Sequence, residues 1–423
     1  IRTRSGVEID AAAHKWDYKD GVNHVSVDFA KFQALSPTLV DGIRSTLAWY
    51  VEHRAPTTVS NIFGRLLQFS RSAGKAGKTL QSIQAADLLN FRAELTRSNE
   101  WYLHTVGGFL KKWRRLGYPG VDADAILLLE QMHIKPCAKG VAVLTLDPDK
   151  GPFTQVETEG LHAALNAAYA AGQIDSEDYV LAWLYILLGQ RSKQYAAMKV
   201  CDVRVKVDDQ GLPTYFVMMP SAKKRTPTPR DRLVERPIVE QVGELLVEHA
   251  ARIRGEFEDR IAPADQAPLF PARQEQREQM APGFEFHRTP QSIGERLVKV
   301  LESLSVRSER TGKAIKVMTR RFRTTIGTRA AEEGYGPLVI AGLLDHTDTQ
   351  SVHVYSANSP AIIERIDRAI AMDMAPLAQA FAGAIRDGEL GAKDPRKRII
   401  DLRIDRSGNP MGECGSHGFC GFS

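Results

Sequence analysis

The segment that most constrains the fold of this chain is the apolar run from Tyr179 to Gly189. A membrane-spanning helix needs about 20 apolar residues, so this shorter run predicts a helix buried in a protein core. Gln190 and Arg191 follow the run directly, and the pattern from Ser192 onward predicts another helix. The sequence thus places a guanidinium group at the edge of a core, where its planar fork can match two oxygens of a bound phosphate.

The length and the charge distribution limit the class of protein. With 423 residues, 43% of them hydrophobic, the chain can bury the cores of two or three domains. Its net charge is +5, and between Ala30 and Pro136 it has 14 Lys and Arg against 8 Asp and Glu. A local surplus of positive charge is typical of a module that neutralises DNA phosphates, although an ordinary solvated surface gives the same count.

Cysteine use and hydropathy indicate the compartment. Two of the four cysteines, Cys137 and Cys201, are isolated in the sequence, which argues against a disulfide framework and favours a reducing compartment. We see no signal-peptide pattern and no apolar run long enough for a membrane span. We therefore expect a cytoplasmic protein that does not contact a membrane.

The first part of the chain divides into an arm, a helical domain and a linker. Residues 1–30 show no clear period, and we expect an arm; residues 31–135 have apolar side chains at helical spacing and predict a four-helix bundle. Gly and Pro among polar residues mark 136–152 as a linker. In the fourth predicted helix, aromatic residues are expected to pack in the core, and the basic residues are the candidates for DNA contact: Lys111, Lys112, Arg114 and Arg115.

The second part, residues 153–386, predicts a larger and mainly helical domain. Three strand-like runs, Val203–Val207, Thr214–Met219 and Val234–Ile238, are separated by turn residues and predict a small antiparallel sheet. The charged and proline-rich stretch 249–290 is interpreted as a surface insertion. Helices are expected to follow it and to end in a helix before a charged tail at 387–423. The predicted fold class is therefore mainly α with a small antiparallel β-sheet.

Three residues near the end of the larger domain suggest a phosphate site. Arg323, His346 and Tyr355 are separated by 23 and 9 residues, and Arg191 can supply a second guanidinium group. A phenol with a pKa near 10 attacks poorly at neutral pH, so a nucleophilic Tyr355 needs surroundings that stabilise both the phenolate and a pentavalent phosphorus. Two arginines suit that task.

This order of residues, Arg191, then Arg320-Arg321-Phe322-Arg323, then His346 and Tyr355, resembles the tyrosine recombinases of the phage-integrase family. The resemblance implies a helical core-DNA-binding domain at 31–135 and a catalytic domain at 153–386. It implies a site-specific recombinase, an integrase of a mobile genetic element, that cleaves and rejoins DNA through a 3′-phosphotyrosyl intermediate. The implied partner is double-stranded DNA, bound by a homo-tetramer on two sites, and no cofactor is required.

The resemblance also implies a role for each site residue. Arg191 and Arg323 would hold the non-bridging oxygens, and His346 would hydrogen-bond the same phosphate. A lysine on the hairpin between the second and third strands would protonate the leaving 5′-oxygen; by position it is Lys223, with Lys224 as the alternative. The family usually has His at the position of Arg320, and a guanidinium cannot serve as a general base. Gln194 stands where the family commonly has Glu.

The tail contains a Cys/His motif. Cys414, His417 and Cys420 supply three metal ligands, whereas a closed structural zinc site needs four, so structural zinc is one interpretation of this segment. The predicted helix before it could dock on a neighbouring protomer or pack on its own domain.

Two alternatives to a recombinase stay open. One is a type IB topoisomerase-like DNA strand transferase, and the other is a catalytically weakened or inactive DNA-binding protein of the same fold.

Overall fold

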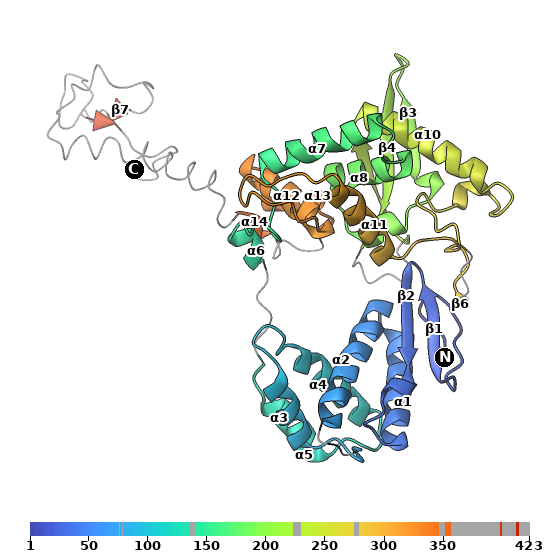
Figure 1. Ribbon diagram of the computed structural model, residues 1–423, viewed down its shortest axis with the longest axis vertical. Helices are drawn as coiled ribbons and strands as arrows, with labels where there is room; N and C mark the ends of the chain where they lie inside the picture. The colour runs from blue at the N-terminus through green and yellow to red at the C-terminus, as the bar shows by residue number, and fades with distance from the viewer. Residues whose placement is uncertain are drawn as a thin grey trace. The chain divides into compact units, whose positions relative to one another are not determined.

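The computed structural model describes residues 1–75, 77, 79–134, 140–222, 230–274, 279–346, 352–356, 398–399 and 412–413 (Figure 1). The chain divides into two units, Ile1–Tyr355 and Ser356–Ser423. In the second unit the described strands β7 (Arg398–Ile399) and β8 (Gly412–Glu413) form one antiparallel pair. All other elements given below lie in the first unit, apart from the last residue of α14.

Helices predominate among the described residues, and the predicted fold class is confirmed. The first buried apolar cluster contains residues of α1 (Pro37–His53), α2 (Pro56–Gly74), α3 (Ala85–Glu94), α4 (Tyr102–Arg115) and α5 (Ala123–Gln131). The second contains residues of α7 (Gln155–Ala170), α8 (Ser176–Leu188), α9 (Ser192–Ala196), α10 (Glu240–Glu256), α11 (Pro290–Ser303) and α12 (Thr319–Glu332). Two short helices are α6 (Val141–Leu144) and α13 (Pro337–Leu343).

The helices begin where the sequence provides caps. Ser36 accepts a hydrogen bond from the N–H of Leu39 at the start of α1, and Pro37 occupies its first turn. Thr154 and Glu157 form a capping box at the start of α7. Such local signals explain why helix positions could be read from the sequence.

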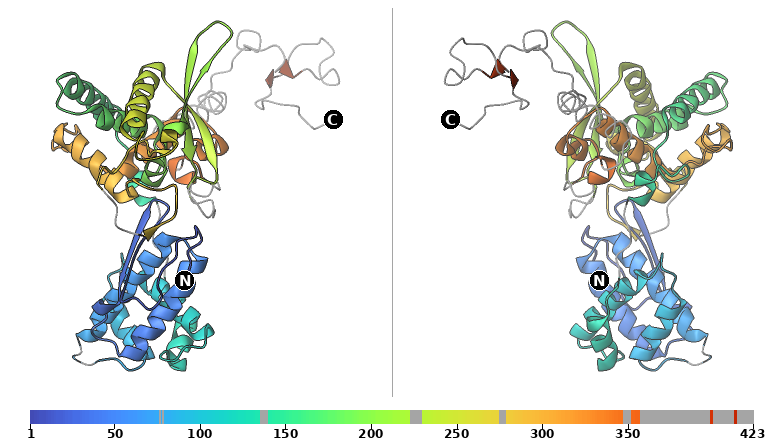
Figure 2. Two further views of the ribbon diagram at one scale, coloured as in Figure 1. Left: turned by 90° about the vertical axis from the view of Figure 1, so that its right-hand side faces the viewer. Right: turned by 90° about the vertical axis from the view of Figure 1, so that its left-hand side faces the viewer.

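The predicted sheet consists of β3 (Val203–Val207), β4 (Pro213–Pro220) and β5 (Leu233–Ile238), all antiparallel, with β4 in the centre. Val217 of β4 is fully buried and pairs with Arg236 of β5, so the inner end of the sheet joins the core. The turn between β3 and β4 extends past the helices, as both views of Figure 2 show.

The first 30 residues differ from the predicted arm. They contain a hairpin of β1 (Lys15–Asp20) and β2 (Asn23–Asp28); its apolar side chains are buried in the first cluster, and β2 packs on α2. Val22 at its turn lies in the second apolar cluster, Lys19 donates to the carbonyl of His287 at 2.9 Å, and β1 pairs in parallel with β6 (Gln279–Met280). Trp16, Tyr18, Val25 and Val27 alternate with polar residues on either side of Gly21, so the sequence carries a strand signal here that the expectation of an arm overlooks.

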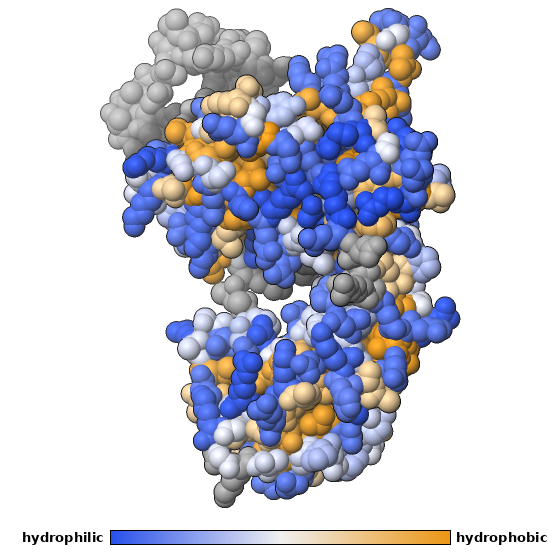
Figure 3. Space-filling model, turned by 45° about the vertical axis from the view of Figure 1, so that its right-hand side comes forward, coloured by the Kyte–Doolittle hydropathy of each residue, from blue (hydrophilic) through white to orange (hydrophobic). Residues whose placement is uncertain are grey.

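The stretch interpreted as a surface insertion also reaches the core. Leu269, Phe270 and Phe284 are buried in the second cluster, although charged and proline-rich sequence surrounds them. In the face shown in Figure 3, hydrophilic residues cover most of the surface and apolar residues form smaller patches between them. No helix within the described residues is both long enough and apolar enough to span a membrane.

Exchanging Gly42 for alanine is expected to destabilise the first cluster, because the new Cβ would lie 2.0 Å from Cζ2 of Trp113. The ring is fully buried, so α1 and α4 must separate, at a cost of roughly 2 to 3 kcal/mol. Gly64→Ala is the matched control, since a Cβ there meets no atom within 4 Å, and it should keep or raise stability by up to about 1 kcal/mol. Urea unfolding followed by tryptophan fluorescence measures both variants. Equal midpoints would contradict the packing of Gly42 against Trp113.

Candidate functional site

A glycine turn between two helices places Arg191. Gly189 ends α8 in the left-handed region, with φ of 54°. A Cβ on Gly189 would lie 2.6 Å from Cδ1 of Ile326 and 3.1 Å from Cα of Arg323, so glycine lets the chain pass this close to α12. Arg191 then caps α9, and its backbone N–H donates to Oε1 of Gln194 at 3.1 Å. The turn therefore brings Arg191 to the side of α12 that carries Arg323.

Arg323 is a buried cation in α12. Its Nη1 donates to the carbonyl of Gly189 at 3.3 Å, and its Nη2 donates to the carbonyl of Leu344. Burial, together with the positive charge of Arg191, lowers the pKa of Arg323 to about 10. The guanidinium group therefore stays protonated at neutral pH, and two hydrogen bonds leave further N–H groups that can face an anion.

Residues 342–345, which we call the carbonyl loop, hold both arginines. A helix leaves its last carbonyl groups without helical partners, and these groups form the negative end of its dipole. At the end of α13, donors from three separate segments meet these carbonyl groups. Arg236 donates to Gly342 at 2.6 Å, Gln190 to Leu343 at 2.8 Å, Arg323 to Leu344, and Arg191 to Asp345 at 3.5 Å. The loop leads directly into His346, whose backbone N–H donates to Ala341 at 2.8 Å.

Sequence reasoning missed the two other donors of this loop. In the sequence Gln190 is only the neighbour of Arg191, and Arg236 belongs to a strand with no spacing signal toward the site. Burial lowers the pKa of Arg236, while the charge of Asp345 acts in the opposite direction. Only the fold shows that this arginine faces the loop before His346.

Tyr355 lies in the short helix α14 (His353–Ser356), and the residue is 8% exposed. A Cβ on Gly327 would lie 2.8 to 2.9 Å from three atoms of the tyrosine ring, so glycine makes room for the ring. Burial raises the pKa of Tyr355 above its ordinary value of 10.0, while the positive charges of Arg323, Arg320 and Arg191 act to lower it. Three guanidinium groups are thus within electrostatic reach of the phenol.

The structure brings together four of the six residues expected to act in catalysis: Arg191, Arg320, Arg323 and Tyr355. His346 follows the carbonyl loop with a half-buried side chain. Lys223 lies outside the described residues, although Ser221 and Ala222 before it are described. Cys414, His417 and Cys420 also lie outside them, so structural zinc stays a prediction. Within the described part of the chain, no group of three or more His, Cys, Asp or Glu side chains could hold a metal ion.

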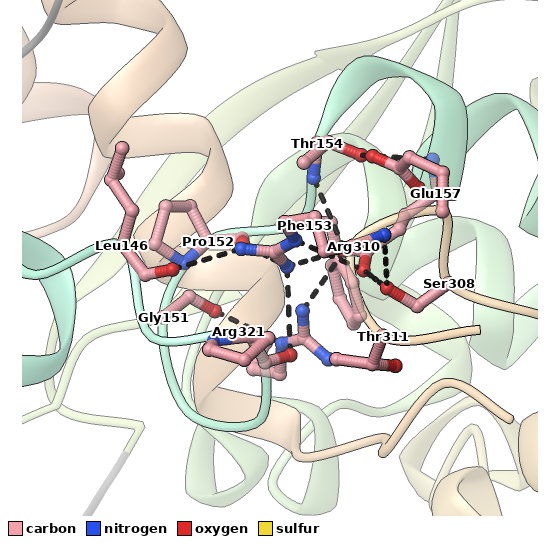
Figure 4. A network of polar contacts seen from close by, with 12 residues as sticks. Leu146, Gly151, Pro152, Phe153, Thr154, Glu157, Ser308, Arg310, Thr311 and Arg321 are labelled. Atoms are coloured by element: carbon pink, nitrogen blue, oxygen red, sulfur yellow. Dashed lines mark hydrogen bonds and ion pairs between the residues drawn. The ribbon is translucent and has the colours of Figure 1, made fainter. Parts of the chain in front are cut away.

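A buried ionic network fixes the start of α12 (Figure 4). Arg321 is fully buried; it donates to Glu157 at 3.1 Å, to the carbonyl of Gly151 at 2.9 Å, and lies 3.8 Å from the centroid of the Phe153 ring. Arg310 donates to the same carboxylate at 2.7 Å. Arg320 and Arg323 are three residues apart and share one face of α12, whereas Arg321 lies on a different face. Anchoring Arg321 in the core therefore turns the face of Arg320 and Arg323 away from this network.

Exchanging Glu157 for glutamine is expected to cost roughly 3 kcal/mol at neutral pH, because Arg321 and Arg310 would lose their buried counter-charge. Burial alone would raise the pKa of Glu157, but hydrogen bonds from Ser308, Arg310 and Thr154 outweigh it, and the pKa lies below its usual 4.5. The stabilisation is therefore present above the unfolded-state pKa and is lost as the pH falls through the lower folded-state pKa.

Thermal unfolding from pH 7 down to pH 3 measures this difference. The stability gap between the wild type and Glu157→Gln should be widest at pH 7 and should narrow as the pH falls below about 4.5. A gap that stayed constant over this range would show that the charge of Glu157 contributes nothing.

The basic residues of α4 have two different environments. Lys111 donates to the carbonyl of Leu129 at 3.1 Å, and Arg114 donates to that of Val121 at 3.0 Å, so both stabilise the helical domain itself. Lys112 lies 3.5 Å from the centroid of the Trp49 ring. Aromatic and basic residues of α1 and α4 line a hollow of about 360 Å³: Trp49, Tyr50, Arg54, Gly108, Lys111, Lys112 and Arg115.

No family model and no curated protein match the chain. Several solved structures match it. A lambda integrase dimer bound to a COC′ core site has a TM-score of 0.46 and 11% identity, over 74% of this chain and 75% of that one. The XerH site-specific recombinase bound to difH substrate has a TM-score of 0.44 and 12% identity, over 80% and 92%. XerA recombinase has a TM-score of 0.34 and 14% identity, over 77% and 96%.

This chain is similar to tyrosine recombinases of known structure. With identities of 11 to 14% and TM-scores of 0.34 to 0.46, its function has to be argued from its own side chains.

Proposed function

We propose that this protein is a site-specific DNA recombinase that cleaves and rejoins strands through a 3′-phosphotyrosyl bond on Tyr355. The observation that supports it most is the convergence of Arg191, Arg320 and Arg323 on one buried tyrosine. A fold gains no stability from gathering three like charges around a phenol. Such an arrangement suits a ligand that carries negative charge, and a phosphodiester supplies it.

In the proposed reaction, Oη of Tyr355 attacks the scissile phosphorus and loses its proton. The bond from phosphorus to the 5′-oxygen breaks, and that oxygen takes a proton from Lys223. Arg191 and Arg323 hold the non-bridging oxygens, and His346 hydrogen-bonds the same phosphate. The phosphotyrosyl bond keeps the energy of the broken phosphodiester, so a 5′-hydroxyl of a partner strand can reverse the step. The guanidinium groups supply the positive charge, and the proposal therefore requires no metal.

Removal of the phenol proton of Tyr355 is the difficult step of this mechanism. The pKa of the phenol is raised by burial, and Arg320 cannot accept a proton at neutral pH. The three guanidinium groups can stabilise the phenolate once it forms, but the proton must leave to water or hydroxide. We therefore infer that the cleavage step accelerates as the pH rises.

The proposed partner is double-stranded DNA, bound by the helical domain and the catalytic domain together. We further propose a homo-tetramer on two DNA sites and a role in integration of a mobile element. The type IB topoisomerase-like reaction uses the same first step, and a DNA-binding protein without catalysis would use none of it.

The covalent step can be tested with a duplex nicked close to its cleavage site, so that the cleaved fragment diffuses away. The DNA flanking the gene is the first source of candidate sites. The wild type should form an adduct that survives denaturing electrophoresis, whereas Tyr355→Phe should form none and still retard the DNA in a mobility-shift assay. DNA binding by the wild type without any adduct would refute both enzymatic readings and leave the DNA-binding protein.

Arg320→His is the informative companion variant, because it restores the residue type that can accept the tyrosine proton. The wild-type adduct rate should rise about tenfold per pH unit below the phenol pKa. With histidine in place, the rate at pH 7 should be at least as high, and its pH dependence should flatten above about 6.5. A large loss in Arg320→His would instead assign arginine an active role at this position.

DNA binding by the helical domain should separate the basic residues of α4 into two classes. Lys112→Ala and Arg115→Ala should weaken binding and lower the salt slope by about 1 each, because Lys112 lies on the Trp49 ring and Arg115 lines the same hollow. Lys111 lines the hollow as well, but its ammonium group donates to the carbonyl of Leu129. Lys111→Ala and Arg114→Ala should mainly cost about 1 kcal/mol of stability, because they lose a hydrogen bond to a backbone carbonyl. Fluorescence anisotropy across a KCl series and urea unfolding measure the two effects. Equal salt slopes for all four variants would contradict the division.

A further inference from the structure

The carboxylate of Asp345 joins segments that are distant in the sequence. Its Oδ2 accepts from the backbone N–H of Ala222 at 3.0 Å and from Nε2 of Gln194 at 3.4 Å, and its Oδ1 accepts from Oγ of Ser221 at 3.4 Å. The residue is 7% exposed. Its φ of 47° lies in the left-handed region, which aspartate tolerates better than most side chains. Burying a carboxylate costs free energy of folding, and its hydrogen bonds must offset that cost.

Gln194 is the side-chain amide that donates to this carboxylate. It is 1% exposed, and both ends of its amide are used. Its Oε1 accepts from the N–H of Arg191, and its Nε2 donates to the carbonyl of Pro220 at 2.8 Å as well as to Asp345. A glutamate at position 194 would have no proton to donate and would set a second negative charge against Asp345. The amide therefore fits this site, and the carboxylate common in the resembled family does not.

The contacts of this pair meet at the proposed reaction centre. Asp345 accepts from Nη1 of Arg191 through its backbone carbonyl and precedes His346. Ser221 and Ala222 continue the chain from the end of β4 and precede Lys223. One carboxylate and one amide thus connect the arginine, the histidine loop and the segment that leads to the lysine.

We propose that Asp345 is a positioning residue that, together with Gln194, fixes the strand end before Lys223 relative to Arg191. This inference rests on the proposed function. In this chain a carboxylate stands at the residue before the histidine, and an amide at position 194 donates to it. The effect of Asp345→Asn should therefore depend on position 194. It should lower the adduct rate of the wild type and raise the adduct rate of a chain that carries glutamate at position 194.

The experiment compares the wild type, Gln194→Glu, Asp345→Asn and the double variant, with Gln173→Glu as a control that adds the same charge at an exposed position. On the nicked duplex, Gln194→Glu should lower the adduct rate at least 100-fold and Asp345→Asn about tenfold, with little change in DNA affinity. Adding Asp345→Asn to Gln194→Glu should raise the rate at least tenfold. Gln173→Glu should stay within about twofold of the wild type.

Hydrogen exchange at the Ala222 amide gives a readout that needs no catalysis. Exchange should be slow in the wild type, at least tenfold faster in Gln194→Glu, and slower again in the double variant. If the wild type forms no adduct but exchange shows this reversal, the proposed recombinase activity fails and the role of Asp345 in holding the strand end stands. The positioning role is overturned if Asp345→Asn has the same effect in both backgrounds. Where the wild type does form the adduct, the positioning role is also overturned if exchange and melting temperature change while the adduct rate does not.

Discussion

The repulsion between buried guanidinium groups is the constraint on which the site depends. The turn at Gly189 places Arg191 next to Arg323, and burial lowers the pKa of both guanidinium groups. Burying a charge costs several kcal/mol unless hydrogen bonds and opposite charge offset it. The carbonyl loop supplies the hydrogen bonds, and the carboxylate of Asp345 supplies the opposite charge. The end of α13 is therefore part of the site, because without it two cations would face each other in a core.

This arrangement also explains how the protein can keep a cationic site ready for an anion. Backbone carbonyls carry partial charges, so they orient the arginines without neutralising them. The proposed phosphodiester substrate would bring a full negative charge and could accept from the N–H groups that the carbonyls leave. Preorganised donors of this kind need little rearrangement when charge develops in a transition state. The same reasoning accounts for Arg321, whose charge is neutralised by Glu157 in the core and is not available to a ligand.

The sequence predicted what depends on local pattern and order. Helix starts with caps, the three-stranded sheet, and the order of arginines, histidine and tyrosine could all be read from it. What could not be read depends on contacts between distant segments. The pairing of β1 with the distant β6 is one such contact, and Arg236 reaches the carbonyl loop because β5 pairs with β4. Lys111 and Lys112 are adjacent in sequence, yet one donates to a backbone carbonyl and the other lies on Trp49. Gln194 stands where the resembled family commonly has Glu, and only the fold shows that it donates to the carboxylate of Asp345.

Arg320 shows why the fold and the rate of the chemistry are separate questions. It stands at the exposed start of α12, three residues before Arg323, and its charge reaches Tyr355. A third cation favours the phenolate and therefore opposes the rise in pKa that burial causes. It does not remove the proton. Where a histidine would offer both a charge and a proton acceptor, arginine offers the charge alone, so the site stabilises the product of deprotonation more than it accelerates the deprotonation. In the proposed mechanism the tyrosine proton would leave to solvent, and its transfer out of the buried site would be the slow step.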